Sequence, residues 1–444
     1  MIRPRAPEAP SLPLGYLVSA SLALVVAAVA LPWLAPELAG HYYHPRVLAL
    51  AHMVTLGWIT LTIMGASYQL IPILLERPVA SERVARWQLP CFVVGVVGVV
   101  GHFAIAEWRG FVWSAGLLTL AALAHVANAG ASVFWTSTAH GRQLFPGTGA
   151  RSSFTARMIG LALVGLALTA LFGTLLGADR IWRFLPGALF PTLHAHVQLA
   201  LLGWVLPMVI GVAARVYPMF LLAPEPAGAG ARVQLIGIAA GVPALVIGLL
   251  VDARPAIVIG SALVAAAVLT HLGSVLAMAR SGKRPRLDWP LRFVLAGSLA
   301  LVPATALGLA LATDLVGGPR MALAYGVLAL GGWASLTIVG MLLKIVPFLV
   351  WYRVYGPRAG REPVPTLAQL SWASGEAIAF VLLIVGLAAL AAAVAAGDVV
   401  AIRAAATLVT LGVLVFAATL ARVLHHLVRY PLRGATAAPL SRAS

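Results

Sequence analysis

The stretch His52–Pro72, HMVTLGWITLTIMGASYQLIP, carries a four-residue skeleton that decides the fold because it occurs three times in the chain. In the first copy, Gly57-Trp58 is followed by Gly65 and then by Pro72. The same residue types return at the same offsets as Gly203-Trp204, Gly211 and Pro218, and as Gly332-Trp333, Gly340 and Pro347. Identical spacing inside three apolar runs indicates an internal triplication.

The composition places these runs in a membrane. Hydrophobic residues make up 61% of the 444 residues, charged residues 10%, and the mean hydropathy is +0.98. Apolar runs long enough to cross about 30 Å of hydrocarbon as helices recur along the whole chain. We predict about twelve spans, the first of them retained, at 14–38, 46–75, 87–106, 111–136, 155–177, 187–222, 232–251, 255–279, 291–313, 320–352, 369–396 and 400–428.

The three copies of the Gly-Trp skeleton fall in the second, sixth and tenth spans, so the repeating unit contains four helices. The predicted fold class is therefore an all-α membrane protein, with about twelve transmembrane helices arranged as three pseudo-equivalent four-helix units. We expect one integral membrane domain over 1–444, with units at about 12–137, 154–280 and 290–429. Small residues one or two turns apart let helices approach closely in lipid, which is the packing role expected of the repeated glycines.

The net charge of +17 is distributed unevenly between the two sides of the predicted bundle. One side holds most of the basic residues, whereas the connections on the other hold only Arg46, Arg109, Arg180, Arg183, Arg254, Arg320 and Arg403. The positive-inside rule then predicts cytoplasmic termini. The charge is thus expected to meet an anionic lipid bilayer, and a nucleic-acid partner is not predicted. Cys91 is the only cysteine, which excludes an intramolecular disulfide and a thiolate metal cluster.

One polar side chain stands twelve residues after the first glycine of each skeleton: Gln69, Arg215 and Lys344. A charged residue inside a span costs about 2.5 to 3.5 kcal/mol at mid-helix. These positions lie about two turns from the helix end, where long side chains can extend to the interface. The alternative is a polar constriction or anion site where the three equivalent helices converge, and the sequence leaves both readings open.

Histidines gather toward the opposite ends of the skeleton helices. His52 precedes the first skeleton, and His194 and His196 stand in HAHVQLALLGW before the second; His41, His44 and His102 are expected at a similar level. Neutral imidazole binds heme iron and copper without a carboxylate or thiol partner, so we predict heme or metal binding by this group. Any one of them alone is more often a hydrogen-bonded structural residue than a ligand.

The spacing of the histidine pair limits its use. Residues two apart on a regular helix point about 200° apart, so His194 and His196 cannot both bind one ion. They would face two clefts, or one would be a ligand and the other a packing residue. The third unit has Tyr325 at the position of His196 and Val327 at that of His52, so its skeleton helix supplies no histidine.

Twelve spans in three units, with histidines near the ends of the second and sixth, resemble subunit I of the heme-copper oxidases. The run of H-x-H, L-G-W, a later glycine and a proline looks most like divergent relatives of that superfamily, among them the NnrS-type membrane proteins. The resemblance implies a bacterial inner membrane location and a suspected heme b, with copper as a further cofactor. It also implies a c-type cytochrome or another redox subunit as partner.

The ligands carry over one by one. The family's low-spin heme uses a histidine on the second helix, which His52 matches, and one on the tenth helix, which is missing here. Its H-x-H pair has a counterpart only in His194 and His196 of the sixth helix. The family's copper site needs histidines on the sixth and seventh helices, and the seventh span here has none. A complete binuclear centre is therefore not expected. Glu376 is the only acid clearly inside a span, so proton pumping is not predicted either.

These observations favour a heme-binding, or copper-binding, membrane protein with cofactor ligands His52, His194 and His196. A metal site would draw on His52, His194, His196, His44 and His102. The expected role is binding or responding to nitric oxide or oxygen, or electron transfer; nitric oxide follows from the NnrS-type resemblance alone. Two alternatives remain at this stage. One is a divergent oxygen or nitric oxide reductase, which leaves enzymatic activity open. The other is a transporter on the same scaffold, whose path would use Gln69, Arg215 and Lys344.

Overall fold

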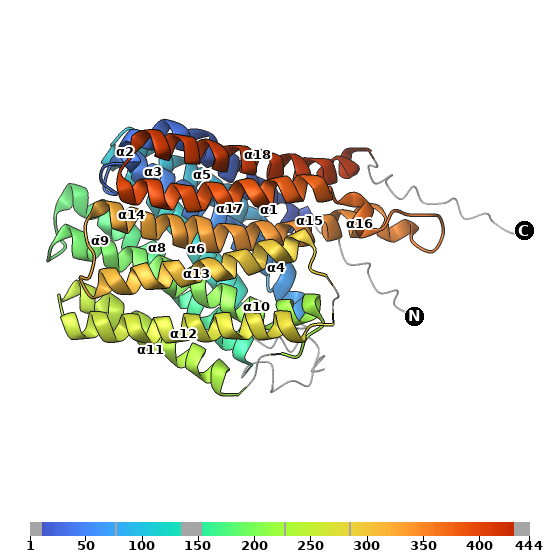
Figure 1. Cartoon of the computed structure of the whole chain (residues 1–444), viewed down its shortest axis with the longest axis horizontal. Coiled ribbons are helices and arrows are strands. Elements are labelled where there is room, and N and C mark those ends of the chain that lie inside the picture. The colour runs from blue at the N-terminus through green and yellow to red at the C-terminus, as the bar shows by residue number, and fades with distance from the viewer. Residues whose placement is uncertain (1–10, 76–77, 135–152, 226–227, 284–285, 430–444) are drawn as a thin grey trace, which may run out of the picture.

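The computed structural model describes residues 11–75, 78–134, 153–225, 228–283 and 286–429, where helices are the only regular secondary structure and are joined by turns and loops. Twelve helical spans within them are long and apolar enough to cross a membrane, which confirms the predicted number. They run side by side along the long axis of the molecule (Figure 1). The predicted end of the fourth span, 135–136, and the first unit boundary at 137 lie outside the described residues.

The helices of the first unit are α1 (Ser11–Ala30), which continues through a 3₁₀ turn into α2 (Ala35–Leu38); α3 (Pro45–His52), which continues into α4 (Leu61–Leu75); α5 (Glu82–Ala104); and α6 (Trp108–Phe134). The second unit contains α8 (Phe154–Trp182), α9 (Leu189–Gln198) continued by α10 (Leu206–Leu221), α11 (Ala229–Leu250) and α12 (Arg254–Ser281). The third contains α13 (Trp289–Ala312), α14 (Pro319–Gly326) continued by α15 (Leu336–Val354), the short α16 (Leu367–Leu370), α17 (Ala373–Ala396) and α18 (Val399–Arg429). We call the end of the bundle where α3, α9 and α14 begin the histidine face.

The three skeleton helices share a feature that the sequence did not predict. Each changes from α-helix to π-helix around its Gly-Trp pair, at Met53–Thr60, Leu199–Val205 and Val327–Ser335. A π-helical turn holds more residues than an α-helical turn, and such turns occur frequently at functional sites. All three units have a π-helical segment at the same position, as expected of pseudo-equivalent units.

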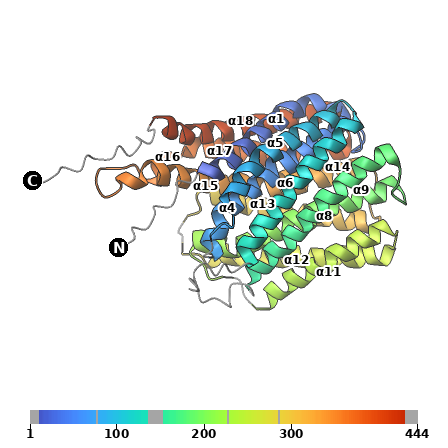
Figure 2. The same ribbon diagram turned by 180° about the vertical axis from the view of Figure 1, so that it is seen from behind.

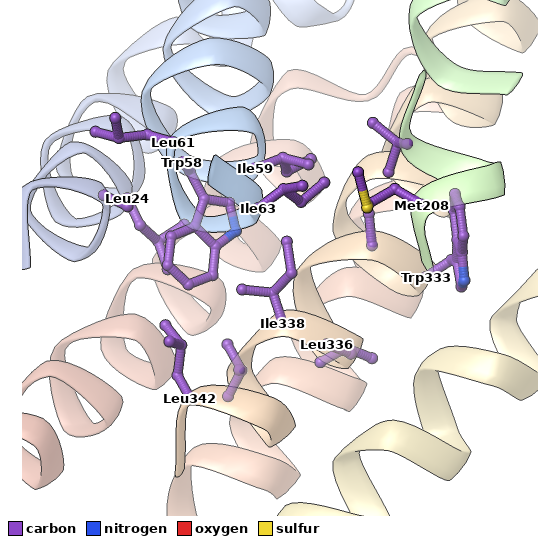
Figure 3. Close-up of a cluster of buried hydrophobic side chains, with 14 of the residues drawn as sticks. Leu24, Trp58, Ile59, Leu61, Ile63, Met208, Trp333, Leu336, Ile338 and Leu342 are labelled. Carbon is purple, nitrogen blue, oxygen red and sulfur yellow. The ribbon is translucent and has the colours of Figure 1, made fainter. Parts of the chain in front are cut away.

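The skeleton helices form the interior of the bundle. In the most apolar stretch of each skeleton helix, 61% to 78% of the residues are buried, against 28% to 44% in the other spans. Their tryptophans, Trp58, Trp204 and Trp333, are among the largest fully enclosed side chains. Figure 3 shows Trp58 and Trp333 with Ile59, Ile338 and Met208 in this core. The remaining helices cover the core and present many exposed hydrophobic side chains, as expected of a lipid-facing surface.

The units close into a ring by repeating the same contacts. In each unit the third and fourth helices pack as a pair: α5 with α6, α11 with α12, and α17 with α18. Neighbouring units join through their fourth and first helices: α6 with α8, α12 with α13, and α18 with α1. Figure 2 shows α5, α6 and α8 side by side on the back of the bundle. Three pseudo-equivalent four-helix units are therefore present, as the triplication predicts.

The second glycine of each skeleton lets the first helix of its unit approach. A Cβ added at Gly65 would stand 2.4 Å from the Cβ of Tyr16, and one at Gly211 would stand 2.7 Å from the Cβ of Met158. At Gly340 it would meet the carbonyl oxygen of Pro290 at 2.5 Å. No side chain fits these contacts, so the repeated glycines have the packing role expected of small residues in membrane helices.

Candidate functional site

A cavity of about 920 Å³ lies in the centre of the bundle and is lined by residues from all three skeleton helices. At the histidine face it is lined by His41, Tyr42, Phe190 and His194. Farther along the skeleton helices its wall includes Trp204, Trp333 and Val339. Most of the lining side chains are apolar, so the few polar groups on its wall determine what it can bind.

His52 lines this cavity from the last turn of α3, immediately before the π-helical segment. Its Nδ1 lies 2.7 Å from the carbonyl oxygen of Leu48, one turn earlier on the same helix, and its ring packs on Phe103 at 4.6 Å between centroids. A neutral imidazole that donates Nδ1–H to a backbone carbonyl carries the lone pair on Nε2. This is the arrangement in which metal-ligating histidines are usually held.

His196 lines the same cavity as His52, from α9. Its Nδ1 is fully enclosed and has no hydrogen-bond partner among the described residues. The ring rests on α8, where Gly173 leaves room for it and Phe172 meets it edge-on at 6.0 Å. A buried polar atom without a partner costs about 1 to 3 kcal/mol, so this nitrogen calls for an explanation.

His194 also lines the cavity, but its Nε2 already has a partner. The hydroxyl of Tyr42 lies 2.9 Å from this nitrogen, in an aromatic group that also contains His41 and Phe190. Burial raises the pKa of Tyr42 above its ordinary value, so the phenol keeps its proton at neutral pH and can donate it to His194. The structure thus separates the two members of the H-x-H pair: His194 is hydrogen-bonded and His196 is not.

The other two histidines predicted as metal ligands lie away from the cavity wall. His44 contributes to a shallow surface pocket with His41 and Pro45. His102 has Nδ1 2.6 Å from the Gly98 carbonyl oxygen and Nε2 3.6 Å from the Glu107 carboxylate. Across the described ranges, no group of three or more His, Cys, Asp or Glu side chains is arranged to hold a metal ion. The structure therefore does not bring the five predicted ligands into one site.

The third unit contributes polar residues other than histidine to the cavity wall. Tyr325, at the position of His196, lines the cavity and donates a hydrogen bond to Oε1 of Gln198 at 3.2 Å. Its ring packs against Gly308 of α13, much as His196 packs against Gly173 of α8. Repeat alignment singles out Tyr325, but the partner Gln198 lies 127 residues away and is visible only in the fold.

The three polar residues predicted as a constriction have separate environments. Arg215 is half exposed and pairs with Glu225 at 2.5 Å. Lys344 pairs with Asp288, the residue that caps α13, and lies 5.6 Å from the centre of the Phe220 ring. Gln69 is partly buried on α4. No hydrogen bond or ion pair links the three within the part of the chain that the structure describes, so a shared constriction stays a prediction.

The residues on the cavity wall fit a heme better than a copper ion. His52 and His196 put imidazoles from two skeleton helices on this wall, and imidazole is an axial ligand of heme iron; the Nδ1 of His196 is enclosed and does not itself border the cavity. The volume and apolar lining match the environment of a large planar cofactor. Copper sites in this kind of fold need several imidazoles around one ion, and such a group is not found among the described residues.

Comparison with known proteins supports the fold. No protein-family model matches the chain, and no curated protein sequence is similar to it. Among solved structures, 33 chains match. One is a heme-copper terminal oxidase, determined as a dimer by cryo-electron microscopy, with a TM-score of 0.64 and 13% sequence identity over 95% of this chain and 84% of that chain. The predicted oxidase subunit I-like fold is confirmed, and the likeness to NnrS-type proteins stays a prediction. The chain is a multi-pass membrane protein that shares the fold of a heme-copper terminal oxidase.

Proposed function

We propose that this chain is a heme-binding integral membrane protein in which His52 and His196 hold a heme b. Its role is to bind or respond to a diatomic gas such as nitric oxide or oxygen, or to pass electrons to a c-type cytochrome or another redox subunit. One observation carries the proposal: two histidines from different skeleton helices, His52 and His196, line one apolar cavity. We place the protein in a bacterial inner membrane, with both termini cytoplasmic.

The chain's own residues prepare the site for such a group. Both imidazoles lie on an apolar wall, and neutral imidazole is the form that binds a metal. The Leu48 carbonyl fixes the ring of His52, and Gly173 with Phe172 fixes that of His196. A bound heme would supply one-electron redox chemistry and an iron that binds diatomic gases. The apolar lining would exclude water from it.

The proposal treats His194 differently from the other two predicted cofactor ligands. The Tyr42 hydroxyl satisfies the Nε2 of His194, so this residue closes the cavity at the histidine face and is not assigned to the iron. The fold of an oxidase supports heme in general, because the matched structure is a heme-copper oxidase; copper has no corresponding support from the described side chains.

Absorption spectra of the purified protein test the proposal. Wild type, His52→Ala, His196→Ala and the matched control His425→Ala, an exposed histidine on α18, would be expressed with ample heme and recorded oxidised and reduced. We expect a Soret band in wild type and in the control, and its loss or shift in the two cavity variants. A colourless wild type, with no heme by extraction, would refute the proposal. Transport assays on Arg215 and Lys344 variants would then be the next step.

A further inference from the structure

Two of the three skeleton tryptophans use their indole N–H groups to connect one unit to another. Nε1 of Trp58 donates to the hydroxyl of Ser335 at 3.1 Å, and Nε1 of Trp204 donates to the hydroxyl of Thr60 at 3.1 Å. Each acceptor stands two residues after the tryptophan of another unit: Thr60 after Trp58, and Ser335 after Trp333. The first unit thus bonds to the third, and the second unit to the first.

The third bond, which would close this pattern into a ring, cannot form. By the same rule Trp333 would donate to residue 206, and this residue is Leu206, which has no acceptor. Trp333 is only 2% exposed, yet its N–H has no hydrogen-bond partner among the described residues. The Nε1 of Trp333 has no partner among these residues, yet it is not one of the fully enclosed side-chain atoms that lack one. This nitrogen is therefore partly accessible and borders open space. Trp333 and Leu206 both line the central cavity.

The surroundings of Trp333 make this donor conspicuous. Figure 3 draws Trp333 and Met208 next to each other, in the same buried core as Leu336 and Ile338. The nearby cavity wall includes Leu206, Leu336 and Val339. A buried tryptophan N–H normally has a hydrogen-bond partner, because leaving it unpaired in an apolar site costs about 1 to 3 kcal/mol. The partner at this position must come from whatever occupies the cavity.

We propose that the Trp333 N–H is the polar anchor of the cavity and donates a hydrogen bond to an acceptor atom of the ligand bound there. This inference rests on the proposed function, since it takes the ligand to be the heme or a gas bound beside it. Both offer the same chemistry, an oxygen or nitrogen lone pair in an apolar cavity. The heme would present it on a peripheral substituent, and the gas on its free end.

Two substitutions remove the donor in different ways. Trp333→Phe deletes the N–H and keeps most of the aromatic ring. Leu206→Ser introduces the missing hydroxyl, so that the third bond of the ring forms and takes the N–H away from the ligand. Leu206→Ala controls for the lost side-chain volume. Trp58→Phe deletes an N–H of the same kind that already has its partner, Ser335.

The test uses the full chain in detergent, with hemin titrated into the heme-free protein and nitric oxide titrated into the reduced, heme-loaded protein. One net hydrogen bond corresponds to about fivefold to tenfold in affinity. We expect Trp333→Phe and Leu206→Ser to weaken hemin binding by this factor if the acceptor is on the heme. If the gas carries it, they weaken nitric oxide binding by this factor instead. Trp58→Phe should stay within about twofold of wild type, and Leu206→Ser should bind more weakly than Leu206→Ala, which shares its loss of side-chain volume.

Thermal unfolding of the heme-free variants checks that they are folded and that the ring closes. We expect Leu206→Ser to be more stable than Leu206→Ala, and this difference to vanish when Trp333 is also replaced by Phe. Unchanged affinity for both hemin and nitric oxide in folded Trp333→Phe and Leu206→Ser would overturn the inference and leave water as the partner of the N–H. Failure of wild type to bind hemin at all would instead refute the proposed function.

Discussion

Gly173 on α8 sets the position of the His196 ring, and replacing it with alanine is a sharp test of the site. A Cβ at this position would stand 2.9 Å from Cε1 of His196, 3.5 Å from Nε2 and 3.7 Å from Nδ1. Ordinary contact begins at 3.4 Å, so the shortest approach falls short by 3.4 − 2.9, or about 0.5 Å. The ring has Phe172 on the same side and must move toward the cavity or push α8 away.

The energetic balance predicts a net loss. Overpacking of this kind costs about 1 to 3 kcal/mol, whereas alanine in place of glycine in a helix gains about 1 kcal/mol. Disturbing the residues that hold a metal ligand typically lowers metal affinity by about 10- to 100-fold. We therefore expect Gly173→Ala to weaken hemin binding by about tenfold and to shift the Soret band, with equal or lower thermal stability.

Gly273→Ala on α12 is the matched control, because a Cβ there would meet nothing within 4 Å. It receives the same gain in helix propensity without the steric conflict. Hemin titration, absorption spectra and thermal unfolding of both variants would be compared with wild type. If Gly173→Ala matches Gly273→Ala in hemin affinity and in spectrum, the assignment of His196 as a ligand held against α8 is wrong.

Three further variants test the fold and the cavity. Gly165→Ala should abolish the folded, monodisperse protein in size-exclusion chromatography, because its Cβ would stand 2.0 Å from the carbonyl oxygen of Gly203; a normal elution profile would contradict the close approach of α8 to the π-helical segment. Tyr42→Phe should leave the Soret band unchanged, since the phenol contacts His194 and not His196; a changed band would return the ligand role to His194. Burial raises the pKa of Tyr42 above 10.0, so folding favours the protonated phenol. The free energy of unfolding of wild type should therefore fall relative to that of Tyr42→Phe as the pH rises above 10.0, and stay constant relative to it at lower pH. Unfolding measurements across this pH range would show the difference. Arg254→Ala should change the free energy of unfolding by less than about 1 kcal/mol, and by even less at high salt, because its 2.5 Å pair with Asp314 at the cavity wall is largely exposed; a larger loss would mean that this pair closes the cavity.

The sequence was sufficient for the architecture because the relevant signals are local. Apolar runs of span length give the number of helices without knowledge of their neighbours. The repeated Gly-Trp, Gly and Pro spacing identifies the three equivalent helices, and those helices form the buried interior. Small residues such as Gly65 and Gly340 predict close helix contacts in lipid, and the structure shows such contacts at both positions.

The site could be predicted only in part. The sequence placed His52, His194 and His196 near one another but could not rank them, because whether an imidazole nitrogen has a partner depends on the side chains that other helices bring to it. The Tyr42 bond that distinguishes His194 from His196 joins residues 152 positions apart. A hydrogen bond between residues so far apart in the sequence cannot be predicted from a local sequence pattern.

What the sequence determined by itself is therefore the class, the number of spans and the threefold repeat, since these depend on hydropathy and on spacing along one helix. What only the tertiary structure decided is which polar atoms remain without partners inside the bundle. The enclosed nitrogen of His196 and the open N–H of Trp333 are defined by the helices that surround them: Gly173 and Phe172 around the first, Leu206 opposite the second. A partner is present or missing only once helices from different units have packed together.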